Sequence, residues 1–146
     1  MNLAMLYNGL GQNNEALALL TSVTNDQPAL GDAWYSLGLL QAEMGDYNKS
    51  ITTLQTAVEL LPERSRIWFN LFRLLEFNND AIGAENALNN CLKIEPRNLE
   101  FLYAKIEFML KEKKEKEAVE VAKKVLEYYP ELPDKAELIN FINSMN

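Results

Sequence analysis

The amino-acid sequence of 146 residues contains no histidine. Histidine is the commonest general base, metal ligand and pH switch, so its absence leaves little basis for acid–base catalysis or a metal site. The one cysteine, Cys91, has no second cysteine with which to form an internal disulfide, so the sequence leaves the redox compartment open. No apolar run approaches the roughly 18 residues that a membrane-spanning helix needs.

Positive charge is also missing from the first third of the chain. Residues 1–48 contain five acidic residues and no Lys or Arg, and the whole sequence has a net charge of −7. Phosphate groups repel such a chain, which argues against nucleic acid and membranes as partners. A basic or neutral polypeptide is the partner that this charge favours.

What organises the sequence is a set of prolines at one constant interval, namely Pro28, Pro62, Pro96 and Pro130. Each of them closes a segment in which apolar residues recur at helical spacing. A period of about 34 residues is typical of stacked supersecondary units. We therefore expect an all-α repeat protein built from helix hairpins.

The clearest unit predicts a first helix over about residues 30–44 and a second one that begins near Tyr47. Gly45 supplies the turn, because glycine adopts positive φ at a helix end without strain. The preceding unit predicts a helix over about residues 14–26. Phe72 stands where the clearest unit has Gly38, and it should widen or shift the local helix packing.

Two further turns and a terminal helix complete the pattern. One turn is expected at residues 78–80, where asparagine tolerates the left-handed conformation, and the other near Lys113 and Lys114. After Pro130, a short helix that starts near Asp134, with Ile139 and Ile142 on one side, reads as a capping helix that covers the last repeat.

The segment from Trp34 to Pro62 resembles a tetratricopeptide repeat, whose signature is W-x₂-L-G-x₂-Y…A-x₃-F…P. Trp34, Leu37, Gly38 and Pro62 match directly, and Gln41, Ser50 and Leu54 fill the Tyr, Ala and Phe positions. The first unit matches with Leu3, Tyr7, Ala16, Leu20 and Pro28, and the third with Trp68, Leu71, Ala84 and Pro96. The fourth keeps Ala118 and Pro130 but has Leu102 for Trp and Ile106 for Gly.

The resemblance implies one domain over residues 1–146, an αα-superhelix (a tetratricopeptide repeat solenoid) of antiparallel helix hairpins. Its repeats would span about 1–28, 29–62, 63–96 and 97–130, with the capping helix at about 133–145. The first repeat lacks the first turn of its first helix, so we expect the chain to be a piece of a longer protein. The first helices would line a concave groove.

Catalytic chemistry finds little support. Glu115 and Glu117 lie in a solvated run of mixed charges, and Cys91 falls on an apolar helix face, where a small buried hydrophobe is expected. No glycine-rich loop opens a helix, so no phosphate cradle is visible. We expect no enzyme activity, no catalytic residue, no cofactor and no metal.

The candidate binding residues follow from positions one repeat apart on the groove face. One position gives Met1, Tyr35, Phe69 and Tyr103, and one turn further along each helix lie Met5, Leu39, Arg73 and Glu107. Aromatic residues and arginine are the types that anchor binding surfaces. The predicted partner-binding residues are Tyr35, Leu39, Arg66, Phe69, Arg73, Tyr103 and Glu107.

One subclass of the family is disfavoured. Tetratricopeptide domains that grip the acidic tails of chaperones use a clamp of Lys, Asn, Asn, Lys and Arg. The corresponding residues here are Tyr35, Leu39, Asn70, Glu100 and Ala104, of which only Asn70 matches.

The resulting hypothesis is a protein–protein interaction scaffold that binds a partner peptide or protein segment in the concave groove. The alternatives are a structural module that self-associates into a homo-oligomer through the truncated first repeat, or a C-terminal interaction region of a larger protein, including a larger enzyme whose catalytic part lies upstream. The compartment stays open: a complete chain would be soluble and cytoplasmic, whereas a fragment is compatible with a periplasmic or secreted protein.

Overall fold

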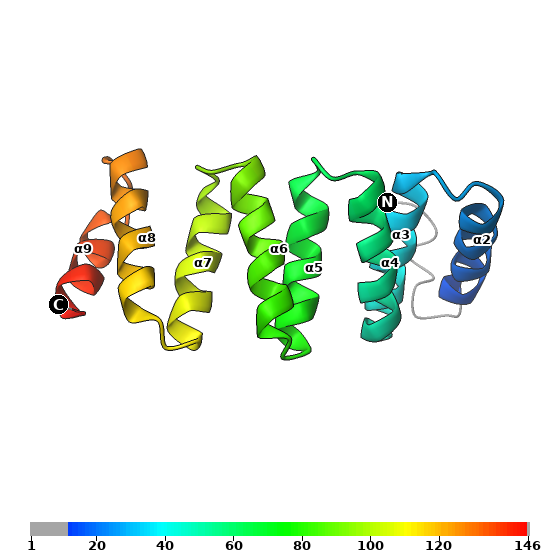
Figure 1. Ribbon diagram of the computed structural model, residues 1–146, viewed down its shortest axis with the longest axis horizontal. Coiled ribbons are helices and arrows are strands. Elements are labelled where there is room, and N and C mark those ends of the chain that lie inside the picture. Colours follow the sequence, from blue (N-terminus) through cyan, green and yellow to red (C-terminus); the bar gives the residue numbers. More distant parts are fainter. Residues whose placement is uncertain (1–11, 146) are drawn as a thin grey trace. The chain divides into compact units, whose positions relative to one another are not determined.

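A computed structural model describes residues 12–145, and all regular structure in that range is α-helical (Figure 1). This confirms the predicted fold class. In chain order the helices are α2 (Gln12–Asp26), α3 (Gly31–Glu43), α4 (Tyr47–Leu60), α5 (Ser65–Phe77), α6 (Ala81–Ile94), α7 (Leu99–Lys111), α8 (Glu115–Tyr128) and α9 (Lys135–Ser144). The predicted first helix of the first repeat, with Met1, Leu3, Met5 and Tyr7, lies outside the described residues.

The helix boundaries repeat with the period of the prolines. First helices begin at Gly31, Ser65 and Leu99, second helices begin at Tyr47, Ala81 and Glu115, and second helices end at Leu60, Ile94 and Tyr128. Each series advances by the interval that separates Pro28 from Pro62. The helices expected at about 14–26 and 30–44 are confirmed as α2 and α3.

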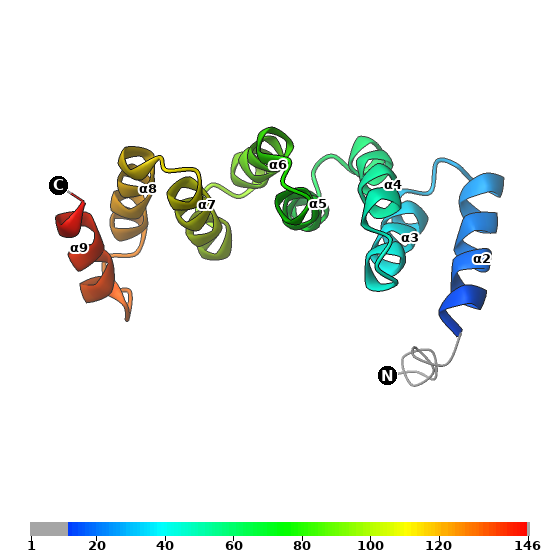
Figure 2. The ribbon, with the colours of Figure 1, turned by 90° about the horizontal axis from the view of Figure 1, so that it is seen from below.

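The described part of the chain forms two compact units, which divide between Ala84 and Glu85. In the first unit α2 packs on α3, α3 on α4, and α4 on α5; in the second α7 packs on α8, and α8 on α9 (Figure 2). Helix α6 runs from one unit into the other, so the predicted effect of Phe72 on the packing of α5 with α6 stays a prediction. The assignment of the whole chain to one domain stays a prediction too.

The turn inside each hairpin has the same backbone geometry. Gly45, Asn79 and Lys113 have positive φ values of 83°, 61° and 61°. The amide of the residue that follows each of them donates to the carbonyl five residues back, as in Asp46 to Gln41 at 2.9 Å and Lys114 to Met109 at 2.8 Å. This is the Schellman arrangement that closes a helix C-terminus. All three predicted turns are confirmed.

The hairpin of α3 and α4 depends on a close approach at Gly38. A Cβ atom at this position would lie 2.5 Å from Cδ2 of Leu54, so any larger residue would force the Leu54 side chain to shift. The buried hydroxyl of Ser50 donates to the carbonyl of Gly38 at 2.6 Å and ties α4 to α3. In the hairpin of α7 and α8 the sizes are exchanged, because Ile106 occupies the position of Gly38 and Ala122 that of Leu54, and both are buried.

The repeat tryptophans also bind the backbone. The indole of Trp34 donates to the carbonyl of Pro28 at 2.9 Å, and that of Trp68 donates to Pro62 at 3.0 Å. Each indole therefore fastens the start of a first helix to the loop before it. These residues build the fold, as the sequence predicts.

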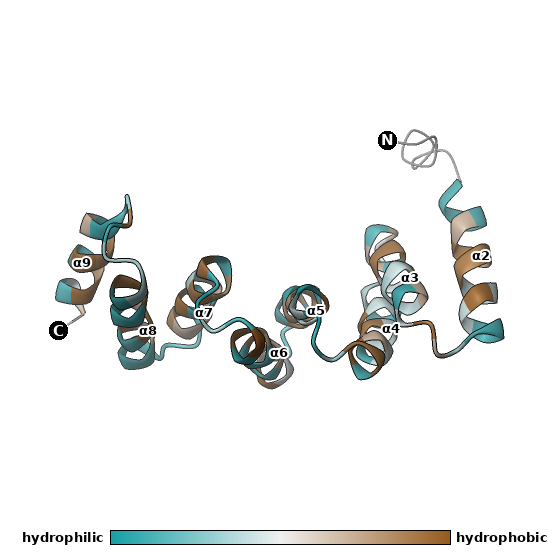
Figure 3. Cartoon of the chain, turned by 90° about the horizontal axis from the view of Figure 1, so that it is seen from above, coloured by the Kyte–Doolittle hydropathy of each residue, from teal (hydrophilic) through white to brown (hydrophobic). Residues whose placement is uncertain are grey.

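The helices are amphipathic, and their apolar sides form the core. Figure 3 shows α8 largely in teal, the colour of hydrophilic residues, because the helix is rich in Lys and Glu. These charged side chains are exposed, whereas Ala118, Val119, Ala122 and Val125 are buried. Cys91 is fully buried in α6, as predicted.

Helix α9 lies on α8, where a capping helix was expected, but its buried side chains are Leu138 and Ile142 and not the predicted pair of Ile139 and Ile142. Leu138 and Ile142 are buried at 7% and 9% exposure, whereas Ile139 is 39% exposed. The buried pair is spaced i, i+4, which places both side chains on one face of a helix, while Ile139 follows Leu138 directly and points elsewhere.

Candidate binding surface

In the first unit, a side-chain hydrogen bond connects α3 and α5, the first helices of two neighbouring repeats. The side-chain amide of Asn70 donates to the hydroxyl of Tyr35 at 2.8 Å. Tyr35 is half-buried, so its ring faces partly outward while its hydroxyl is held from the neighbouring first helix. This bond fixes the two helices of the predicted groove face against each other.

Phe69, the next residue of the predicted aromatic series, is buried at 4% exposure. Its ring packs against Phe72 at 5.6 Å between centroids, and the guanidinium groups of Arg66 and Arg73 lie 5.3 and 5.9 Å from its centroid. The two arginines occupy positions −3 and +4 relative to Phe69, which is the spacing of neighbours on one helix face. Phe69 therefore lies beneath the two arginines and has almost no exposed surface with which to contact a partner.

In the first unit, the more exposed members of the predicted set are Leu39, Arg66 and Arg73. Leu39 is 40% exposed on α3, one turn after Tyr35. Arg73 stands at the position of α5 equivalent to Leu39, and both arginines are exposed. We call Tyr35, Leu39, Arg66 and Arg73 the arginine face.

The remaining predicted residues belong to the second unit. Tyr103 on α7 is half-buried, and its hydroxyl donates to Oδ2 of Asp134 at 2.8 Å. Burial, then the hydrogen bond and negative charge of Asp134, raises the pKa of Tyr103 to about 12. Tyr103 is therefore engaged in holding the start of α9. Glu107 is exposed on α7, one turn further along.

The sequence interpretation missed the partners of these tyrosines. Asn70 was considered only as a clamp residue, and Asp134 only as the start of the capping helix, where its side chain makes no cap hydrogen bond. Asn70 is 35 residues after Tyr35 and Asp134 is 31 after Tyr103. The period of the prolines already places these partners about one repeat apart, so a search for polar residues one repeat after each tyrosine could have found them.

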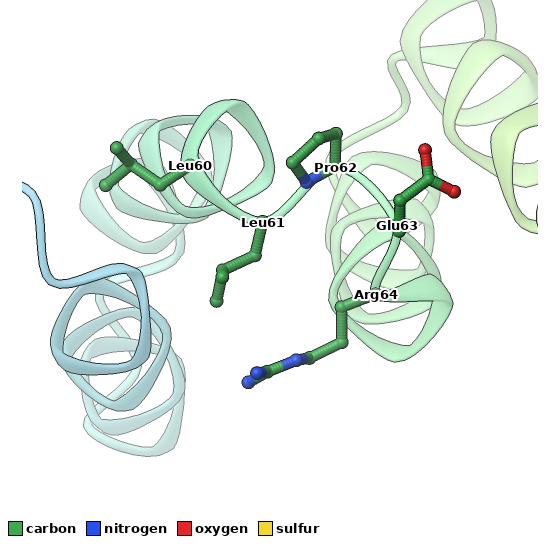
Figure 4. Close-up of a pocket in the computed structure, with 5 residues that line it drawn as sticks. All are labelled: Leu60, Leu61, Pro62, Glu63 and Arg64. Atoms are coloured by element: carbon green, nitrogen blue, oxygen red, sulfur yellow. The ribbon is translucent and has the colours of Figure 1, made fainter.

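A hollow of about 390 Å³ lies beside the loop from α4 to α5 and is lined by Leu60, Leu61, Pro62, Glu63 and Arg64 (Figure 4). Arg64 forms an ion pair with Asp32, so the cation at its edge is already engaged. A second hollow of about 360 Å³ lies at Tyr128–Pro133, two repeat lengths later. Because a hollow occurs at the equivalent loop of two repeats, it reflects the repeat architecture and does not mark a specific binding site.

Other kinds of site find no support in the described part of the chain. Within residues 12–145 no cluster of three or more Cys, Asp or Glu could hold a metal ion. Over the same range no helix is both long enough and apolar enough to cross a membrane.

Comparison with known proteins places this geometry among helical repeat proteins. The sequence profile of the tetratricopeptide repeat matches residues 31–63. No curated protein sequence matches the chain.

Several solved structures share the fold. A crystal structure of MamA has a TM-score of 0.74 at 14% identity and covers 99% of this chain and 93% of that chain. A tetratricopeptide repeat protein from Parabacteroides merdae ATCC 43184 has a TM-score of 0.80 at 18% identity, over 97% of this chain and 57% of that chain. MamA 41-end from Desulfovibrio magneticus RS-1 has a TM-score of 0.72 at 17% identity, over 90% and 74% of the two chains.

Proposed function

We propose that the chain is a protein-interaction scaffold that holds a segment of a partner protein on the arginine face. The match of residues 31–63 to the tetratricopeptide repeat and the shared fold support a scaffold, because that family is typically non-enzymatic. The observation that carries the proposal is the pair of arginines fixed over one buried ring. Arg66 and Arg73 both lie close to the Phe69 centroid, at 5.3 and 5.9 Å.

The stacking prepares both guanidinium groups for a ligand. A guanidinium that lies on an aromatic ring loses little further freedom on binding, and its planar fork matches a carboxylate. Arg66 and Arg73 are seven positions apart, about 10.5 Å along the helix axis. A partner segment with two carboxylates at about that separation would fit them.

Leu39 and Tyr35 add an apolar part to the surface. Leu39 is 40% exposed, and the Tyr35 ring is held by Asn70. Aromatic and arginine side chains in one surface supply most of the energy of many interfaces. The proposed partner segment therefore combines acidic residues with an apolar side chain, although the chain as a whole is acidic.

A selection of displayed linear peptides on the full chain tests this. We expect enrichment of Asp and Glu beside an apolar residue. Selected peptides should bind the double variant Arg66→Glu, Arg73→Glu at least tenfold more weakly, a loss of about 1.4 kcal/mol. The control Lys123→Glu, Lys124→Glu, which makes the same change in net charge on α8, should keep the affinity. Peptides without acidic residues, or equal loss in both variants, would exclude the arginine face.

Self-association through the first repeat stays a prediction, because the predicted first helix of that repeat lies outside the described residues. Tyr103 and Glu107 also stay predicted binding residues, although the Tyr103 hydroxyl already donates to Asp134.

A further inference from the structure

A second surface of the first unit is apolar without a structural need for it. Four large apolar side chains are exposed at its helix turns: Met44 at 37%, Tyr47 at 37%, Phe77 at 68% and Ile82 at 87%. Met44 and Tyr47 flank the turn between α3 and α4, and Phe77 and Ile82 flank the turn between α5 and α6. We call these four residues the turn-edge patch.

Direct contacts join the two turns into one surface. The rings of Tyr47 and Phe77 meet edge to face, with centroids 5.0 Å apart and planes at 65°. Beside them the side-chain amide of Asn78 donates to Oδ1 of Asn48 at 3.4 Å. Both turns have the closed Schellman geometry described above. The patch is therefore held in place before any partner binds.

The repeat fold does not require apolar residues at these positions. One repeat after Phe77 and Ile82 stand Lys111 and Lys116, and two repeats after Met44 and Tyr47 stand Glu112 and Glu115. The hairpin of α7 and α8 forms the same turn with these charged residues. Exposed apolar side chains that the fold can do without, gathered in one place, mark interaction surfaces.

The surroundings of the patch are acidic. Glu43, Asp46, Glu76 and Asp80 lie on or beside the two turns, and Lys49 is the one base within the same stretches 43–49 and 76–82. Lys49 pairs with Asp46 at 3.5 Å, and Asp80 accepts a hydrogen bond from the amide of Gly83 at 2.9 Å. An apolar centre with an acidic rim is complementary to an apolar segment flanked by bases.

We propose that the turn-edge patch docks a basic amphipathic helix of a partner protein, whose apolar face covers Phe77, Ile82 and Tyr47 while its Lys or Arg residues meet the acidic rim. The apolar face of the helix would bury the two aromatic rings and Ile82. The carboxylates would favour a positively charged helix and increase its association rate. This surface shares no residue with the arginine face, and it takes a ligand of the opposite charge.

A designed peptide pair provides the probe. One peptide carries Leu at helical i, i+3, i+4 and i+7 spacing with Lys at the remaining positions, and the other carries Glu in place of Lys. Binding of each labelled peptide to the full chain is measured by fluorescence polarisation. We expect the basic peptide to bind at least tenfold more tightly than the acidic one, and to weaken as salt is added.

Variants of the chain locate the binding. Phe77→Ser with Ile82→Ser removes exposed side chains, so the helical circular dichroism should be unchanged while affinity for the basic peptide falls at least tenfold. Asp46→Asn with Asp80→Asn removes the negative charge, keeps one acceptor oxygen at each position, and should reduce the affinity and its salt dependence. Arg66→Glu with Arg73→Glu should not weaken binding of the basic peptide, which separates this proposal from the proposed function.

Three results would overturn the proposal. Equal affinity for the acidic and basic peptides would remove the role of the rim. Unchanged affinity in the Phe77→Ser, Ile82→Ser variant would place the peptide elsewhere. A concentration-dependent dimer in sedimentation experiments, abolished by the same variant, would show that the patch pairs two copies of this chain.

Discussion

The hydroxyl of Tyr103 on α7 donates a hydrogen bond at 2.8 Å to Oδ2 of Asp134, the residue that precedes α9. This bond connects α7, the first helix of the fourth repeat, to the residue just before α9. Tyr103 was predicted to contact a partner, and it contacts part of its own chain. The terminal helix is thus fixed by a polar contact at its start and by Leu138 and Ile142 along its length.

The Tyr103 phenol should titrate later than an ordinary tyrosine. Its pKa is raised from 10.0 to about 12, first by burial and then by Asp134, so the folded state keeps a proton that the unfolded state releases between these values. Stability from this group is present below pH 10 and is lost as the pH rises from 10 to 12. Absorbance titration of phenolate should show one late tyrosine that Tyr103→Phe removes. Asp134→Asn should bring the pKa of Tyr103 down part of the way, and an unchanged pKa would contradict the contribution of Asp134.

The close approach of α3 and α4 predicts a specific coupling between Gly38 and Leu54. Gly38→Ala should destabilise the chain by about 1–3 kcal/mol, because the new Cβ meets Leu54. Leu54→Ala should cost about 2–5 kcal/mol through the cavity it leaves.

The double variant Gly38→Ala, Leu54→Ala should cost less than the sum of the two, since the methyl group then has room. Urea unfolding of all four proteins measures the coupling. Strict additivity would mean that Leu54 already moves aside at no cost. In the hairpin of α7 and α8, the large residue Ile106 stands at the position of Gly38 and the small residue Ala122 at that of Leu54, and both are buried.

Lys113→Gly should stabilise the chain by up to about 1 kcal/mol, because a side chain at positive φ is strained and glycine is not. Lys113 has a φ of 61° and stands at the position that Gly45 occupies in the hairpin of α3 and α4. The matched control Lys124→Gly, at an exposed site inside α8, should destabilise by about 1 kcal/mol. Thermal unfolding followed by circular dichroism compares them, and a loss of stability in both variants would count against strain at the turn.

Glu85 should support the charge of a largely buried lysine. Its carboxylate lies 3.8 Å from the amine of Lys105 and 3.3 Å from that of Lys114, and the Lys105 side chain is 13% exposed. Burial lowers the pKa of Lys105, and Glu85 acts in the opposite direction. Glu85→Gln should therefore lower that pKa further.

The pH dependence of the Glu85→Gln variant follows from this shift. Its loss of stability should be largest at neutral pH, where folding must hold the charged amine. It should shrink as the pH rises through the folded pKa of Lys105, because the neutral amine no longer needs the carboxylate. Urea unfolding at several pH values measures this. The control Glu120→Gln removes an exposed pair with Lys123 and should change stability by no more than about 1 kcal/mol. A loss independent of pH would exclude the role of Glu85.

Much of the fold was predictable because it depends on local spacing. Four prolines define the period, and the turns at Gly45, Asn79 and Lys113 fall one repeat apart in the structure as in the sequence. The error at Ile139 shows the limit of such reasoning. Leu138 and Ile139 are adjacent and both apolar, and their side chains point in different directions from the helix axis. Only the packing of α9 decides that Leu138 is buried and Ile139 exposed.

The candidate site was less predictable. Repeat positions identify which residues share a face, but not how deeply each one sits. Phe69 and Tyr35 occupy equivalent positions, yet Arg66, Arg73 and Phe72 cover Phe69, while Tyr35 stays half-exposed and is held by Asn70. The turn-edge patch was not predicted at all, since its residues break no rule of the repeat.

By itself, the sequence determined the helices, their period and the turns, because hydrophobic spacing and backbone preference act over a few residues. The tertiary structure decided which side chains are covered. Exposure depends on what the neighbouring helix presents, and contacts such as Asn70 with Tyr35 or Tyr47 with Phe77 join residues about one repeat apart. The proposed binding surfaces rest on that second kind of information.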